Sequence, residues 1–196
     1  MENDLCAIGA RVAHPLFHAE NGGSIPTIAL HVKELIFEPC EKRHAVELVR
    51  IWHSRLPECQ AGPWQYAFRA HKNDCTYAVA LWNNPSARCL PGHWLELRRM
   101  ACAPDCPKNT PSKFLAWMIR YFRAKCPERE KAISYQDLSV HSGTIYKAAG
   151  WTVEHVSKPR IRDRSKARTG TERLYRSNKN GLAPDAAGKA RWAKTL

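Results

Sequence analysis

The sequence predicts an α/β (α+β) fold in which helices flank a mixed, mostly antiparallel central sheet. Three features support this prediction: an extended run that leads through a turn into an amphipathic helix, two apolar runs joined by turn residues, and a strand, short helix and strand in succession. Strands and helices in this order are typical of a layered domain around one core. The three features occupy residues 94–125, 64–81 and 131–156.

The extended run over 94–103 leads directly to the start of a helix. Thr110 is a suitable N-cap, and Pro111 suits the first helical position. Free amides and the positive end of the helix dipole attract anions, so we expect an anion site here; the alternative is an ordinary capped helix. The residues expected to line this anion site are Lys108, Asn109, Thr110, Ser112 and Lys113. The residues expected to bury one helix face are Phe114, Leu115, Met118, Ile119 and Phe122.

The other elements follow from periodicity and turn chemistry. Lys72-Asn73-Asp74 joins the two arms of a hairpin, and Gly150 ends a short helix. The further expected elements are extended runs over 27–32 and 35–37, helices over 41–56 and 142–149, and strands over 131–137 and 151–156. The apolar face expected for the first helix contains Ala45, Leu48, Val49, Trp52 and Leu56.

We divide the chain into a loose N-terminal segment (1–24), a catalytic domain (25–156) and a basic C-terminal strand and tail (157–196). One more strand is expected near Leu174 and Tyr175, and the final residues are expected to form a mobile tail. Basic residues alternate at the start of this C-terminal part, so an extended chain projects them in one row, where they can contact DNA; the alternative is a role in solubility alone. These residues are Lys158, Arg160, Arg162 and Arg164.

The charge balance indicates a polyanionic partner. The 196 residues contain 31 Lys and Arg against 18 Asp and Glu, a net charge of +13. Nucleic acid is the first expectation and an anionic membrane surface the second. The sequence contains neither an apolar run of membrane-spanning length nor a basic-then-apolar leader.

The eight cysteines are scattered without a C-x-x-C pair, which favours reduced thiols over a disulfide framework. Cys102 and Cys106 could join a histidine on zinc, although paired spacing is more typical of structural zinc. The histidines show no diagnostic spacing, so the sequence leaves a metal site unknown.

The order of elements resembles the GNAT acyltransferase superfamily, with CPKNTPS (106–112) in place of its usual glycine-rich loop. The chain more closely resembles the phage Mu Mom family of DNA-modifying proteins. The matching motifs, which together cover roughly 64–156, are ELRRM (96–100), PKNTPS (107–112), SYQD (134–137) and HSGTIYKAAGW (141–151).

The Mom resemblance implies an enzyme that adds a carbamoylmethyl (acetamido) group to the exocyclic amine of adenine in duplex DNA and so protects phage DNA from host restriction. It implies a phage- or prophage-encoded protein in the bacterial cytoplasm. The expected donor is acetyl-CoA or a related acyl donor, with a redox metal such as iron as a further alternative. Double-stranded DNA is the expected partner, and no membrane partner is expected. The resemblance leaves open whether the protein forms a homodimer. The competing functions are a non-catalytic DNA-binding module and an acetyltransferase for a protein or small amine.

Three residues are assigned to catalysis. Asp137 ends a strand, where its carboxylate can accept a proton from the amine; the alternative is a cap for the following loop. Tyr146 matches the tyrosine that protonates a departing thiolate in many GNAT enzymes; otherwise it is a half-buried helix aromatic. Neighbouring arginines on a strand point to opposite faces, so one can enter the site while the other pairs with an acid such as Glu96. We assign Arg99 to the site.

The adenine amine is buried in the base stack, so the enzyme is expected to extrude the base and stack it on an aromatic side chain. The hairpin supplies the candidates Trp64, Tyr66, Tyr77 and Trp82. At least two of these must pack in the core, and Tyr66 is assigned to the base.

Overall fold

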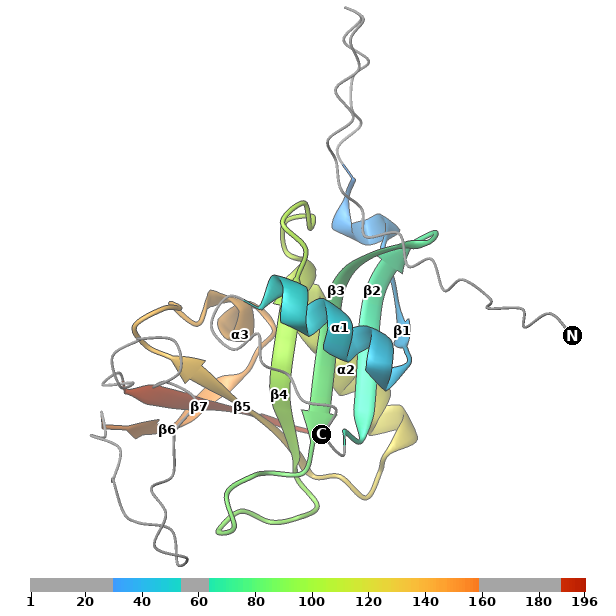
Figure 1. Cartoon of the computed structure of the whole chain (residues 1–196). Helices are drawn as coiled ribbons and strands as arrows, with labels where there is room; N and C mark the ends of the chain where they lie inside the picture. The colour runs from blue at the N-terminus through green and yellow to red at the C-terminus, as the bar shows by residue number, and fades with distance from the viewer. Residues whose placement is uncertain (1–29, 54–63, 159–187) are drawn as a thin grey trace, which may run out of the picture. The chain divides into compact units, whose positions relative to one another are not determined.

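The computed structural model describes residues 30–53, 64–158 and 188–196 (Figure 1). Its strands form one seven-stranded sheet in the order β1-β2-β3-β4-β5-β7-β6. The chain divides into two compact units, described separately below. The first contains the described residues up to Asn83 together with Arg99–Phe114, and the second contains Asn84–Arg98 and the described residues from Leu115 onward. β4 (Leu95–Cys102) and α2 (Thr110–Lys125) contribute residues to both units.

In the first unit, β1 (Ile36–Pro39), β2 (Tyr66–Lys72) and β3 (Cys75–Asn83) pair antiparallel. Lys72 pairs with Cys75 across a two-residue turn, in which Asn73 has a φ of 51°. Asparagine tolerates this left-handed conformation, which two-residue hairpin turns require. The predicted hairpin is therefore confirmed.

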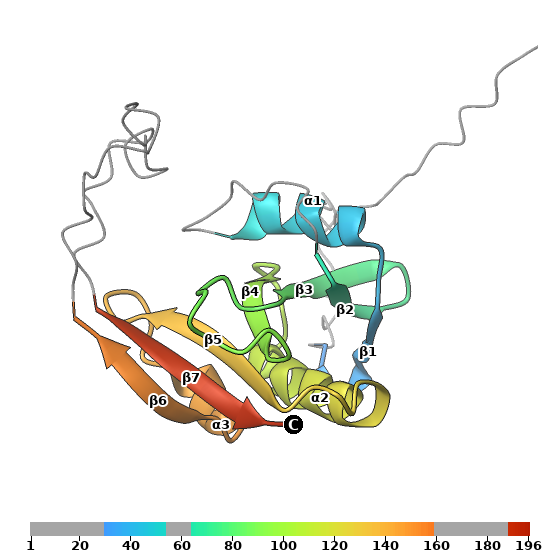
Figure 2. The same cartoon turned by 90° about the horizontal axis from the view of Figure 1, so that it is seen from below.

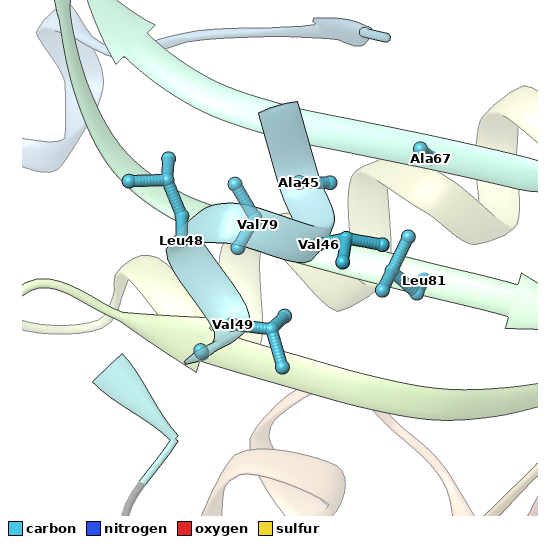
Figure 3. Close-up of a cluster of buried hydrophobic side chains, with 8 residues drawn as sticks. Ala45, Val46, Leu48, Val49, Ala67, Val79 and Leu81 are labelled. Carbon is cyan, nitrogen blue, oxygen red and sulfur yellow. The ribbon is translucent and has the colours of Figure 1, made fainter. Parts of the chain in front are cut away.

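α1 (Lys42–Trp52) packs its apolar face on β2 and β3 (Figures 1 and 3). Ala45, Leu48 and Val49 of the predicted face are buried, as is Val46 beside them, and they meet Ala67, Val79, Leu81 and Ala101 in one cluster. Lys42, Arg43 and Arg50 lie exposed on the opposite side of the helix. The amphipathic pattern thus predicts the buried face; Leu56 lies outside the described residues.

The extended run expected over 27–32 is wrong at its last residue. Val32 begins a short 3-10 helix, Val32–Glu34, instead of ending a strand. The His31 ring accepts a hydrogen bond from the Lys33 amide (3.1 Å), and the Glu34 carboxylate accepts one from the His31 amide (2.8 Å). This reciprocal capping box closes the backbone into a turn, which overrides the extended preference of the apolar residues.

In the second unit, the first half of β4 pairs parallel with β5 (Lys131–Asp137). β7 (Lys189–Thr195) pairs antiparallel with the whole of β5 on one side and with β6 (Thr152–Ser157) on the other (Figure 2). The short helix α3 (Thr144–Ala148) connects β5 to β6, and Gly150 after it has a φ of 71°. The strands and helix predicted over 131–156 are confirmed within two residues.

The prediction of a mobile C-terminal tail is wrong for the final residues, which form β7. Ala190 and Trp192 are buried while Lys189 and Arg191 alternate with them on the other face. This two-residue period is typical of a strand, although the high basic content suggested a tail. The strand expected near Leu174 and Tyr175 lies outside the described residues.

α2 buries the predicted stripe completely or nearly so: Phe114, Leu115, Met118, Ile119 and Phe122 are at most 3% exposed. Its start differs from prediction, because Thr110 is the first helical residue rather than the N-cap. None of the helices in the described ranges is both long and apolar enough to cross a bilayer.

Candidate active site

β5 places alternate side chains of SYQD on its two faces. Ser134 and Gln136 are buried, with exposed fractions of 3% and 4%, whereas Tyr135 between them is 37% exposed. This alternation follows from the two-residue period of a strand. The buried face therefore presents two polar side chains to α3.

Tyr146 of α3 contacts the first of these side chains. Its hydroxyl lies 2.9 Å from Ser134 Oγ, which in turn lies 3.4 Å from the carbonyl oxygen of Leu97. The Leu97 carbonyl can only accept, whereas either hydroxyl of the Tyr146–Ser134 pair can be the donor. The Tyr146 hydroxyl is therefore held at Ser134 within the buried face of β5.

Two tryptophans enclose the Tyr146 ring. Trp192 of β7 stacks on it with ring centroids 5.3 Å apart and an angle of 13°, and Trp151 meets its edge at 5.8 Å and 62°. Burial raises the pKa of the Tyr146 hydroxyl above its ordinary value, while the hydrogen bond with Ser134 opposes this shift. The phenol therefore carries its proton at neutral pH.

Hydrogen bonds of the Gln136 side chain connect the segment before α3 to Trp192 of β7. Its Oε1 accepts a hydrogen bond from Trp192 Nε1 (2.6 Å), and its Nε2 donates to the carbonyl oxygen of His141. Gly143 has a φ of 74°, and a Cβ there would lie 2.6 Å from Trp192 and 2.7 Å from Gln136. Only glycine fits this position, because both the backbone conformation and the space exclude a side chain.

Sequence reasoning missed Trp192 and Gln136. Trp192 was assigned to the tail, and Gln136 was quoted only as part of SYQD. The alternation of Ala190 and Trp192 with basic residues could have revealed the strand that brings the indole to Tyr146.

Asp137 caps the turn that follows β5. Its Oδ1 accepts hydrogen bonds from the Ser139 amide (3.0 Å) and from Ser139 Oγ (2.6 Å). Its carbonyl oxygen accepts from the amides of Val140 and His141. The structure thus shows the predicted capping role in the same unit as Tyr146, and the catalytic role stays a prediction.

One of the two neighbouring arginines of β4 pairs with Glu96, as predicted. Arg98 Nε lies 3.2 Å from Glu96 Oε1, and Glu96 also accepts a hydrogen bond from the Ser86 amide (2.8 Å). Arg99, the next residue of β4, belongs to the first unit, whereas Asp137 and Tyr146 belong to the second. Its place in the site stays a prediction.

The turn before α2 fits an anionic group through charge rather than through hydroxyls. Thr110 is buried and its Oγ1 donates to the Pro107 carbonyl (2.7 Å), while Ser112 Oγ donates to the Asn109 carbonyl (3.0 Å). Asn109 takes a φ of 67°, a left-handed conformation that glycine adopts most readily and asparagine tolerates. Lys108 and Lys113 are exposed, so their ammonium groups and the helix dipole are what this turn offers to a phosphate.

The structure describes only two of the residues predicted to bind DNA, Tyr66 and Lys158. Tyr66 is half-buried and stacks on Phe68 with ring centroids 6.4 Å apart, whereas Trp82 is completely buried. Lys158 is exposed at the end of β6. Arg160, Arg162 and Arg164 lie outside the described residues.

The thiols of Cys102 and Cys106 interact with each other in the first unit. Cys102 donates a hydrogen bond to Cys106, which lowers the pKa of Cys106 and, with burial, raises that of Cys102. In the described ranges, no three His, Cys, Asp or Glu side chains are arranged to hold a metal ion. The described cysteines, which are Cys40, Cys75, Cys89, Cys102, Cys106 and Cys126, are free thiols.

Comparison with known proteins identifies both a family and a fold. The family model of the Mom protein family matches residues 34–190. No curated protein matches the chain.

Solved structures with the same fold are acetyltransferases. The Bacillus subtilis acetyltransferase in complex with CoA is 14% identical, with 83% of this chain and 99% of that chain covered and a TM-score of 0.54. A GNAT-family acetyltransferase from Streptococcus pneumoniae is 12% identical, with 83% and 99% covered and a TM-score of 0.55. The ribosomal-protein-S18-alanine N-acetyltransferase from Escherichia coli is 12% identical, with 83% and 94% covered and a TM-score of 0.50. The predicted GNAT-like fold is therefore confirmed.

Proposed function

Since this chain belongs to the Mom protein family, we propose that it is a GNAT-like transferase that adds a carbamoylmethyl (acetamido) group to the exocyclic amine of adenine in duplex DNA. The observation that carries this proposal is the pairing of a buried, protonated Tyr146 with Ser134 in the unit that also holds Asp137. The modification would protect phage DNA from host restriction.

Tyr146 is proposed as the general acid. Its hydroxyl is protonated at neutral pH, and its ring is fixed by Trp151 and Trp192. A fixed proton donor contributes to rate because it needs no reorganisation when a leaving group develops negative charge. The hydrogen bond with Ser134 fixes the position of the hydroxyl, and burial keeps the phenol protonated.

Asp137 is proposed to act on the adenine amine. The lone pair of this amine is delocalised into the ring, so it is a poor nucleophile and benefits from a nearby carboxylate that accepts its proton. The Ser139 contacts fix the orientation of the Asp137 carboxylate at the end of β5. In α/β sheets, ligands bind beyond the carboxyl ends of the strands, which is where Asp137 lies.

The donor is proposed to be acetyl-CoA or a related acyl donor, whose phosphates would bind Lys108, Lys113 and the amides at the start of α2. Bound there, it would supply an activated acyl thioester. The proposed product is joined to nitrogen through a methylene carbon and ends in an amide, so acetyl transfer from acetyl-CoA alone does not produce it. A different acyl donor, a separate source of the amide nitrogen or a redox metal would therefore have to take part. The residues of this turn are therefore assigned to donor binding alone.

DNA is proposed to bind at the end of β5 that holds Asp137. Lys189 pairs with Asp137 on one side and with Ser157 on the other, so the exposed Lys158 follows at the same end of the sheet. The intervening residues 159–187 contain eight Lys and Arg against three acidic residues. Such an excess of cations is typical of a phosphate-binding segment.

Mass spectrometry of nucleosides from plasmid DNA of cells that express the chain tests the proposal. We expect an adenosine that is heavier by one carbamoylmethyl group, and we expect it to be absent in cells that express Tyr146→Phe. An increment of one acetyl group would indicate plain acetyl transfer to DNA. Unmodified adenosine with tight DNA binding would favour the non-catalytic module instead.

A further inference from the structure

The turn after β5 exposes two large apolar side chains. Leu138 is 45% and Val140 is 40% exposed, whereas the leucine, isoleucine and methionine side chains of α2 in the same unit are at most 3% exposed. Single exposed apolar residues are common, but two in one three-residue turn beside a proposed catalytic residue indicate a contact surface.

Hydrogen bonds hold this turn in one conformation. Four consecutive amides donate: Leu138 to the Gly188 carbonyl (3.1 Å), Ser139 to Asp137 Oδ1 (3.0 Å), and Val140 and His141 to the Asp137 carbonyl (3.2 and 3.1 Å). Gln136 Nε2 donates to the His141 carbonyl from the sheet side. Because these amides are all satisfied, the two apolar side chains are presented from a fixed backbone rather than from a loose tip.

The surroundings of the turn suit a nucleic acid. Asp137 directly precedes Leu138 and pairs with Lys189 of β7, which in turn pairs with Ser157 of β6. The chain of residues 159–187, rich in Lys and Arg, is joined covalently to this end of the sheet at Lys158 and at Gly188. Apolar side chains close to the described cations Lys158 and Lys189 match the chemistry of DNA, which presents phosphates outside and apolar base faces inside its stack.

We propose that Leu138 and Val140 form a wedge that enters the duplex and fills the space left by the extruded adenine. This role rests on the proposed DNA substrate. An adenine inside the duplex cannot reach a carboxylate at the end of a strand unless it leaves the stack, and unstacking is costly. Apolar side chains inserted between base steps offset that cost by packing against the exposed base faces. The location directly after Asp137 places the wedge beside the residue that would meet the extruded base.

The test uses the full chain, a duplex that carries 2-aminopurine at adenine positions, and no donor. 2-Aminopurine becomes more fluorescent when it leaves the base stack. We expect Leu138→Ala with Val140→Ala to reduce the fluorescence gain on binding by about tenfold, because the cost of unstacking is no longer offset. The matched control is Ile51→Ala with Val153→Ala, which removes two apolar side chains that are at least as exposed (60% and 48%) from other elements and should retain the gain. A duplex with an abasic site opposite each 2-aminopurine is already disordered. With this duplex, the wedge variant and the wild type should give the same fluorescence gain.

Fluorescence anisotropy of the same samples separates the wedge from the proposed function. If the wedge variant binds DNA as tightly as the wild type and gives the same fluorescence gain, then the wedge is wrong, whereas the proposal of a DNA substrate is unaffected. A lack of DNA binding by the wild type overturns both. A shift in oligomeric state for the wedge variant with an unchanged fluorescence gain would assign the turn to self-association and would also overturn the wedge.

Discussion

The Tyr146 phenol and the Trp192 indole stack at 5.3 Å, although 46 positions separate them in the sequence, and the same indole donates to Gln136. One side chain of β7 thus sets the position of the proposed acid and of the helix that carries it. The residues that support a site are often as important to its geometry as those that react.

Tyr146→Phe keeps the ring and removes the proposed acid. We expect a loss of DNA modification of about 100- to 10,000-fold and a loss of stability of only about 1 kcal/mol. Ser134→Ala is the matched control, because it removes the same hydrogen bond but keeps the phenol. If the two variants lose modification equally, then the hydrogen bond matters and the acid assignment is wrong; nucleoside mass spectrometry and thermal unfolding measure both effects.

Asp137→Asn keeps an oxygen that can accept from Ser139 but removes the negative charge. We expect the turn to persist and modification to fall by about 100-fold or more, because the amine loses its proton acceptor. Ser139→Ala, which removes one donor to the carboxylate, should retain more activity. If the Asn variant modifies DNA at the normal rate, then the catalytic role of Asp137 is wrong and its carboxylate only caps the turn.

Gly143→Ala should destabilise the chain by about 2 kcal/mol or more, because a side chain at a φ of 74° is strained and its Cβ meets Trp192 and Gln136. Gly92→Ala is the control, since a Cβ there meets no atom within 4 Å. Urea unfolding of both variants measures the difference. Equal midpoints would contradict the close packing at the start of α3.

Lys108→Ala with Lys113→Ala should reduce modification while DNA affinity stays nearly intact, because this turn is assigned to the donor. Ser112→Ala alone should have little effect, since its hydroxyl donates to the Asn109 carbonyl. Filter binding of DNA and modification in cells are measured together. A collapse of DNA binding in the double lysine variant would instead assign the turn to a DNA phosphate.

Neutralising Lys158, Arg160, Arg162 and Arg164 should flatten the salt dependence of duplex binding. Each lost phosphate contact lowers the slope of log affinity against log salt by about 0.9. The control neutralises four exposed cations of the helices, which are Lys42, Arg50, Arg120 and Lys125. An equal change of slope in both variants would show that net charge alone, rather than this segment, attracts DNA.

Local patterns predicted most of the fold. The stripe of α2, the hairpin turn at Asn73 and β5 all follow from periods and turn residues that are visible in a short window. β7 was not predicted, because its pairing with β5 joins residues far apart in the sequence and because its basic residues mask a two-residue period. Thr110 illustrates a smaller failure: a hydroxyl suited to capping donates to the Pro107 carbonyl instead, a choice that only the folded turn decides.

The sequence assigned the reactive groups of the candidate site but not the residues that support them. The roles of Asp137 and Tyr146 were assigned from motifs and stay predictions, whereas the expected pairing of an arginine with Glu96 is confirmed for Arg98. Ser134, Gln136 and Trp192 make their contacts only when β5, α3 and β7 meet, so a pattern within one element does not show what these side chains touch.

The position of β7 between β5 and β6 also determines when this protein can mature. β5 cannot complete its ladder until Lys189–Thr195 has left the ribosome, because those residues pair with the whole of Lys131–Asp137. Such non-local closure is slow compared with local helix and hairpin formation. A chain in which Lys189–Thr195 has not yet paired therefore holds Tyr146 without the Trp192 stack, and its competence for chemistry should arise only once β7 has paired with β5.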